Sequence, residues 1–192
     1  MKRLFLFGAF VLVSAFPALA QGTTSWQIDP AHSNAQFTVR HLGISNVQGQ
    51  FTKVAGTVQL NEQDVTKSSV TATVEMASVD TRDGGRDGDL KSANFFDVAK
   101  FPTMTFTSKS ISKSADGKVS MTGDLMLHGV TKEITFSVDG PTDAIKDPWG
   151  NTRRGASATA KIHRSDFGIT KYPSTVVGED INITLDVEIT KK

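Results

Sequence analysis

Cysteine is absent from the 192-residue sequence. Its absence excludes disulfide bonds, thiol catalysis, metal sites with cysteine ligands and the lipid-modified cysteine of a lipoprotein. A chain without disulfides must be held together by an ordinary hydrophobic core, and a chain of this length can build such a core as a single domain.

The N-terminal segment has the features of a secretory signal peptide. Two basic residues follow the initial methionine, residues 4–16 form an apolar run, and residues 18–20 read Ala-Leu-Ala, which signal peptidase accepts. The apolar run is shorter than the ~20 residues that a membrane span needs. We therefore predict cleavage after Ala20, a mature domain over residues 21–192 without stable membrane insertion, and a periplasmic location.

An excess of charge of one sign is also lacking. The sequence has 21 Lys and Arg against 20 Asp and Glu, and loss of Lys2 and Arg3 with the signal peptide leaves 19 basic residues. The mature net charge is then about −1 with neutral histidines. This balance argues against nucleic acid or an anionic membrane surface as the main partner.

Helix-period patterns are scarce, whereas apolar and polar residues alternate with a period of two along most of the chain. Such alternation is typical of β-strands with one buried face. The alternating segments are 34–40, 54–60, 70–76, 103–111, 119–127, 134–138, 156–162 and 181–189. About eight antiparallel strands must close on themselves or split into a sandwich to hide their edges. We predict an all-β fold, a single antiparallel β-barrel.

One segment interrupts this alternation. Charges and glycines follow Arg82 and run into the adjacent aromatic pair Phe95-Phe96. The segment predicts a short helical insertion around residues 84–95. Arg82 and Arg86 match phosphate geometry and are candidates for holding a lipid head group, although a solvated charged loop is the alternative interpretation.

The interior of the predicted barrel has two interpretations. Inward-phase positions mix small residues such as Ala72 and Ala158 with large ones such as Phe106 and Leu125. Small side chains leave volume that small apolar ligands commonly occupy in barrels. A packed interior, in which small residues accommodate large neighbours across the core, stays open as the alternative.

Catalytic motifs are lacking. The sequence has no G-x-S-x-G elbow and no phosphate-binding loop, and no two of its histidines have metal-ligand spacing. We predict no metal site, no cofactor and no enzyme. A metal-dependent or redox enzyme that uses His41, inward by phase, with nearby acids stays an alternative. The histidines are His32, His41, His128 and His163.

Eight short motifs occur in an order that resembles the YceI-like family over residues 26–189. They are Asp29-Pro30-Ala31-His32-Ser33, Gly49-Gln50-Phe51, Val79-Asp80-Thr81, Phe95-Phe96-Asp97, Phe106-Thr107-Ser108, Gly123-Asp124-Leu125, His128-Gly129-Val130-Thr131 and the run 164–169, Arg-Ser-Asp-Phe-Gly-Ile. One departure is visible, because Asp89 stands where the family pattern Arg-Asp-x-His-Leu has His.

The resemblance implies a lipocalin-like barrel that binds a polyisoprenoid or a similar long-chain lipid, of quinone or prenyl phosphate type, and that is not an enzyme. The lipid would be a ligand, and a homodimer would cover sheet edges. The apolar residues that we expect to line the interior are Phe37, Val39, Phe51, Phe106, Leu125, Leu127 and Phe136, with Phe95, Phe96 and Phe167 nearer the mouth. The head-group candidates are His41, Arg82 and Arg86.

Overall fold

The computed structural model describes residues 22–192, so the predicted signal peptide and its cleavage site lie outside the described residues. The strands are β1 (Thr23–Ile28), β2 (Asn34–His41), β3 (Ser45–Phe51), β4 (Val54–Asn61), β5 (Ser69–Glu75), β6 (Val79–Asp80), β7 (Thr103–Lys113), β8 (Val119–Leu127), β9 (Val130–Asp139), β10 (Ile145–Lys146), β11 (Thr152–His163) and β12 (Val177–Lys191). The α-helix is α1 (Gly84–Lys91), and 3-10 turns span Val65–Lys67, Met76–Ser78 and Arg164–Phe167. Within residues 22–192, no helix has the length and apolar character needed to cross a membrane.

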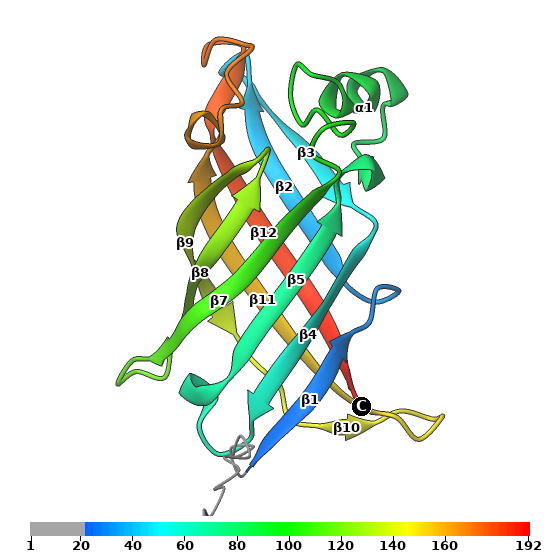
Figure 1. The fold of residues 1–192 in the computed structure, drawn as a ribbon, viewed down its shortest axis with the longest axis vertical. Helices are drawn as coiled ribbons and strands as arrows, with labels where there is room; N and C mark the ends of the chain where they lie inside the picture. The colour runs from blue at the N-terminus through cyan, green and yellow to red at the C-terminus, as the bar shows by residue number, and fades with distance from the viewer. Residues whose placement is uncertain (1–21) are drawn as a thin grey trace, which may run out of the picture.

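The strands form a closed antiparallel barrel, as predicted (Figure 1). β12 pairs with β11 on one side and with both β1 and β2 on the other. β1 and β2 pair with successive parts of the same edge of β12, so they form two parts of one interrupted strand. β3 and β4 pair with β2 and β1 in the same way. The barrel therefore has eight strands, and the pairing of β11 with β12 closes it.

The period of two places alternate side chains inside. In β8 every second residue from Val119 to Leu127, including Gly123, is buried, whereas the residues between them are less buried or exposed. Phe106 of β7 lies opposite Leu125 in the ladder. Most inward residues of the strands belong to one main apolar cluster, and a second cluster contains Trp26, Ile28, Leu60 and Ile189.

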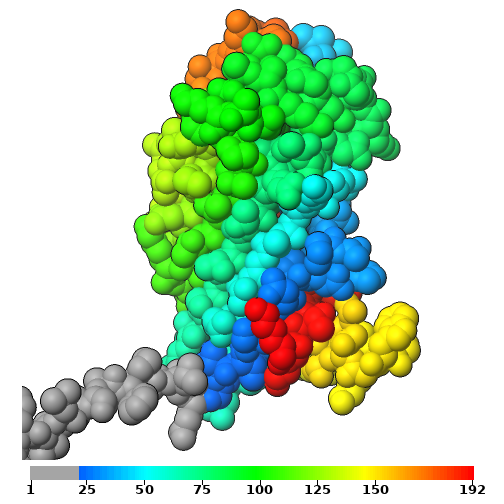
Figure 2. Space-filling model, turned by 45° about the vertical axis from the view of Figure 1, so that its right-hand side comes forward, coloured from blue at the N-terminus to red at the C-terminus, as the bar shows by residue number. Residues whose placement is uncertain are grey.

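The two ends of the barrel differ. The upper end carries α1 and the segment that follows β11, and the lower end carries the β4–β5 and β7–β8 turns. Figure 2 shows the chain around α1, in green, lying over the upper end, while the yellow hairpin between β10 and β11 projects at the lower end.

Helix α1 is shorter than the expected insertion of residues 84–95. It begins after Asp83, whose side chain accepts a hydrogen bond from the backbone N–H of Arg86, and it ends at Lys91. Three of its eight residues are glycines, which are poor helix formers. Hydrogen bonds to the Asp87 side chain from the N–H and hydroxyl of Thr81 hold the helix against β6.

Candidate ligand-binding cavity

A cavity of about 280 Å³ lies inside the barrel, and its wall is almost entirely apolar. Nine of the ten residues expected to line the interior lie on this wall. They are Phe37, Val39, Phe51, Phe95, Phe96, Phe106, Leu125, Leu127 and Phe136. The tenth, Phe167, is 1% exposed and packs in the core beside the cavity, because the 3-10 turn that follows β11 turns it into the core cluster.

The small inward residues have two different roles, so both interpretations of the interior hold at different positions. A Cβ on Gly123 would lie 2.4 Å from the carbonyl oxygen of Thr107 and 2.6 Å from Cζ of Phe106, so this glycine accommodates its neighbours. Ala72 and Ala158 instead lie on the cavity wall. The interior is therefore hollow beside these alanines and tightly packed at Gly123, so the alternative of a fully packed barrel does not describe it.

Aromatic side chains hold parts of the wall in place. The rings of Phe106 and Phe136 meet edge to face with centroids 5.3 Å apart. Phe51 contacts Phe37 on one side and Phe96 on the other, each at 5.8 Å between centroids. Such aromatic contacts stabilise a fixed arrangement of rings beyond the area that they bury.

The three head-group candidates do not line the cavity. Arg86 is occupied by Thr81, because its Nε donates to the hydroxyl at 2.8 Å and its Nη2 to the carbonyl at 2.9 Å. Arg82 is exposed and has a positive φ of 63°. His41 lies at the end of β2, opposite Ser45. We expected these side chains near the ligand from strand phase and from their place in the sequence. Neither signal shows how the chain turns at the ends of the barrel.

A buried arginine that we did not predict as a site residue lies on the cavity wall instead. Arg164 is 5% exposed, and its guanidinium donates to the carbonyl oxygens of Ile169 (2.6 Å), Tyr172 (2.7 Å), Val177 (2.9 Å) and Gly178 (3.1 Å). One side chain thus shapes the segment that covers the upper end. The sequence signal that could have identified Arg164 was its place at the start of the motif at residues 164–169.

We call the chain around α1 and the segment that follows β11 the cap, because they lie at the upper end of the barrel. The cap contains Asp89. Its carboxylate accepts hydrogen bonds from Asn94 Nδ2 at 2.7 Å and from the Tyr172 hydroxyl at 3.2 Å. The ring of Tyr172 stacks on Phe95 with centroids 5.3 Å apart. The hydrogen bond with Asp89 raises the pKa of Tyr172.

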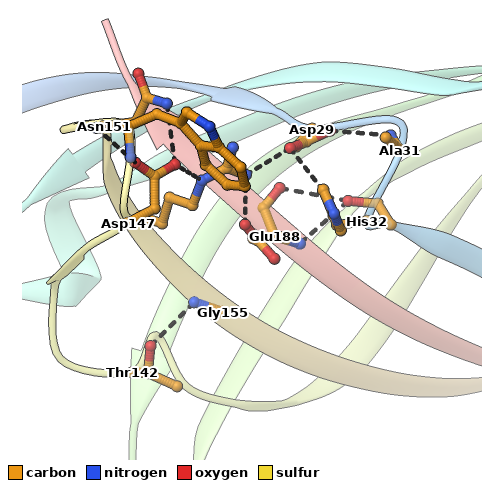
Figure 3. A network of polar contacts seen from close by, with 11 residues as sticks. Asp29, Ala31, His32, Thr142, Asp147, Asn151, Gly155 and Glu188 are labelled. Atoms are coloured by element: carbon orange, nitrogen blue, oxygen red, sulfur yellow. Dashed lines mark hydrogen bonds and ion pairs between the residues drawn. The ribbon is translucent and has the colours of Figure 1, made fainter.

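A polar network lies on the outside of the lower half of the barrel (Figure 3). The guanidinium of Arg153 pairs with Asp29 and Asp147, each at 2.6 Å, and with Glu188. His32 Nδ1 lies 2.9 Å from Oδ2 of Asp29, the same oxygen that accepts from Arg153. Hydrogen bonds with His32 and then Arg153 lower the pKa of Asp29 to about 2.

This network contains the one group of three potential metal ligands found among residues 22–192, Asp29, His32 and Glu188. Arg153 already supplies a positive charge to both carboxylates. His41, the expected member of a metal or redox site, does not belong to the group. The arrangement is explained by structural ion pairing.

Comparisons with known proteins agree with this architecture. The model of the YceI-like domain matches residues 26–189. Protein YceI of Escherichia coli O157:H7 is 36% identical over 184 residues, which cover 94% of this chain and 92% of that protein. The crystal structure of Campylobacter jejuni YceI superposes with a TM-score of 0.69 at 33% identity, covering 80% of this chain and 90% of that one. A polyisoprenoid binding domain from Saccharophagus degradans has a TM-score of 0.65 at 13% identity, covering 88% and 99%. The chain therefore belongs to the YceI-like family.

Proposed function

We propose that the protein binds a polyisoprenoid or a similar long-chain amphiphilic lipid inside the barrel and carries or sequesters it in the periplasm. The observation that carries this proposal is the apolar cavity of about 280 Å³. Each CH₂ group hidden from water contributes about 0.8 kcal/mol, so an apolar tail needs few polar contacts to be held. Affinity then comes from the tail.

The neighbouring structure described as a polyisoprenoid binding domain supports this ligand class, because it shares the barrel fold. The wall composition supports binding without catalysis. Among the described residues of the wall, the charged side chain is Arg164, and its donors are directed to four backbone carbonyls. A lipid in the cavity would meet no acid, base or nucleophile arranged for a reaction.

Native mass spectrometry of protein isolated from the periplasm, beside an organic extract of the same sample, tests the proposal. We expect one lipid per chain, and the same spectra report whether the chain is a homodimer. N-terminal sequencing of this material should begin at Gln21, the residue after Ala20. A protein of ligand-free mass, even after incubation with prenyl lipids, would refute lipid binding.

A cavity-filling variant provides the control. Ala158 lies on the cavity wall in β11, whereas the next residue, Thr159, is exposed on the other face. Ala158→Trp should abolish lipid loading, and Thr159→Trp should preserve it. Equal loading of the two folded variants would show that the lipid does not occupy this cavity.

A further inference from the structure

A second cavity, of about 260 Å³, lies at the lower end of the barrel. It is bounded by the β4–β5 turn, the end of β7, the segment after β9 and β11. Its lining residues are Leu60, Asn61, Glu62, Gln63, Asp64, Val65, Lys113, Pro141 and Arg154. Leu60, Val65 and Pro141 also line the apolar cavity, so the two cavities meet at these three side chains.

Arg154 is a fixed part of this second cavity. Its side chain is 15% exposed, its Nη1 donates to the carbonyl oxygen of Thr142 at 2.6 Å, and its Nη2 pairs with the carboxylate of Glu62. The guanidinium lies over the ring of Trp26, 5.5 Å from the centroid. Thr24 donates a second hydrogen bond to Glu62 at 3.1 Å. The positive charge of Arg154 is thus already compensated.

The charges around the second cavity are balanced. Glu62 and Asp64 oppose Arg154 and Lys113 on its wall, and Lys67 pairs with Asp64 at 3.3 Å from outside the wall. A diphosphate would bring several negative charges next to two carboxylates, which is unfavourable at close range. An uncharged head with acceptor oxygens avoids this repulsion.

The wall nevertheless offers hydrogen-bond donors. Lys113 contributes an ammonium group. The side-chain oxygen of Asn61 accepts from the backbone N–H groups of Gln63 and Asp64, so its amide NH₂ is the group that remains for a ligand. Donors that lie beside the two carboxylates Glu62 and Asp64 suit carbonyl, hydroxyl or ether oxygens.

We propose that the second cavity receives the head group of the bound lipid, and that this head group is uncharged and carries acceptor oxygens, as in a quinone or a prenyl alcohol. The tail passes Leu60, Val65 and Pro141 into the apolar cavity. This inference rests on the proposed function. In this arrangement the polar end of the ligand lies at the lower end of the barrel, whereas α1, Arg82 and Arg86 lie at the upper end.

Farnesol and farnesyl diphosphate test the inference, because they share one tail and differ in head-group charge. Glu62→Gln removes the acid that pairs with Arg154 and keeps the side-chain shape. We expect farnesyl diphosphate to bind about tenfold more tightly to Glu62→Gln than to the unmodified protein, whereas the affinity for farnesol stays within about twofold. Isothermal titration calorimetry measures both affinities.

Matched variants make the result specific. Glu75→Gln removes an exposed acid that pairs with Lys53 at the upper end of β5, and it should leave the ratio of the two affinities unchanged. Asp64→Asn removes the other acid of the second cavity and keeps an acceptor for the hydrogen bond from Thr66. It should shift the ratio in the same direction as Glu62→Gln.

Trp26 reports the location of the head group. Trp26 and Trp149 are the two tryptophans of the sequence, and Trp149 is 81% exposed, so Trp149→Phe leaves the indole beside Arg154 as the fluorophore. Decylubiquinone, whose ring quenches indoles at short range, should quench this emission.

The outcomes separate the two proposals. If both farnesyl probes bind but neither acid variant changes their affinity ratio, and decylubiquinone binds without quenching Trp26, the head group lies elsewhere and lipid binding stands. If none of the probes binds the unmodified protein, lipid binding fails and the inference fails with it.

Discussion

The hydroxyl of Tyr172 donates a hydrogen bond of 3.2 Å to the carboxylate of Asp89, and this bond joins the segment after β11 to α1. Stacking of Tyr172 on Phe95 makes a second contact, between the segment after β11 and the chain that follows α1. The position of Asp89, where the family pattern has His, therefore has a structural consequence. A carboxylate accepts from both Tyr172 and Asn94, so it ties the cap together from two sides.

Tyr172→Phe should loosen this cap without removing the aromatic stacking. Loss of one hydrogen bond to a charged group is expected to lower the free energy of unfolding, less the part that water restores at this half-buried site. Release of a bound lipid should become faster in a stopped-flow displacement experiment. Identical release rates in Tyr172→Phe and the unmodified protein would show that the cap does not control exchange at this end.

Arg164→Ala should be severely destabilising. The substitution leaves four backbone carbonyls without their donor and removes a buried cation, and the loss of one partner from a buried charged network costs about 3–5 kcal/mol. Urea unfolding followed by circular dichroism measures the change. Arg40→Ala, at an exposed arginine whose side chain donates to Asn46, is the control and should change stability by less than about 0.5 kcal/mol.

Two glycine substitutions should act in opposite directions. Gly123→Ala would place its Cβ 2.4 Å from the carbonyl oxygen of Thr107, and we expect a loss of about 1–3 kcal/mol from overpacking. Gly88→Ala lies in α1 with no atom within 4 Å of the added Cβ, so it should gain about 0.5–1 kcal/mol. Thermal melts of both variants measure the difference, and a change of the same sign in both would contradict the packing at Gly123.

Acid unfolding should depend on Asp29. Its pKa is about 2 in the folded protein against an ordinary value of 3.8, because of hydrogen bonds with His32 and then Arg153. A carboxyl whose pKa is lowered by folding stabilises the protein above its ordinary pKa, and this contribution disappears as the pH falls from about 4 to about 2.

The substitution Asp29→Asn should therefore lower stability at neutral pH and make the loss of stability between these two pH values less steep. Asp143→Asn, at an exposed acid of the segment before β10, is the control and should leave the pH profile unchanged. Urea unfolding at a series of pH values gives both slopes. Equal slopes for Asp29→Asn and the unmodified protein would contradict the low pKa of Asp29.

The cavity wall could be predicted from the sequence because it follows from strand phase. Alternate residues of a strand point to one face, so the inward positions of Phe37, Phe106 and Leu125 are set by counting along each alternating segment. The same argument did not predict β1 or β3. β1 has two large apolar residues, Trp26 and Ile28, and such a short alternation does not separate a strand from a loop.

The ends of the barrel could not be predicted in the same way. Asp89 acts through a hydrogen bond with Tyr172, 83 residues later, and Arg164 acts through backbone carbonyls of the loop that follows it, and no period within one strand reports such contacts. Arg86 was assigned to a ligand because of its chemistry, but the backbone around Thr81 uses the same donors. The polar lining of the second cavity likewise depends on how the β4–β5 turn meets the end of β7, the segment after β9 and β11.

The closure of the barrel has a consequence for the order of folding. β12 is the last strand, yet it supplies the partner for β11, β1 and β2. A chain that leaves the ribosome N-terminus first can pair β1 with β4 and β2 with β3, but the second edge of β1 and of β2 stays open until residues 177–191 emerge. Pairing over such a long sequence separation is slow to form, which is typical of sheets rich in non-local contacts. Assembly of the barrel is then a late, all-or-none step, and until that step the early strands have open edges that need protection from aggregation.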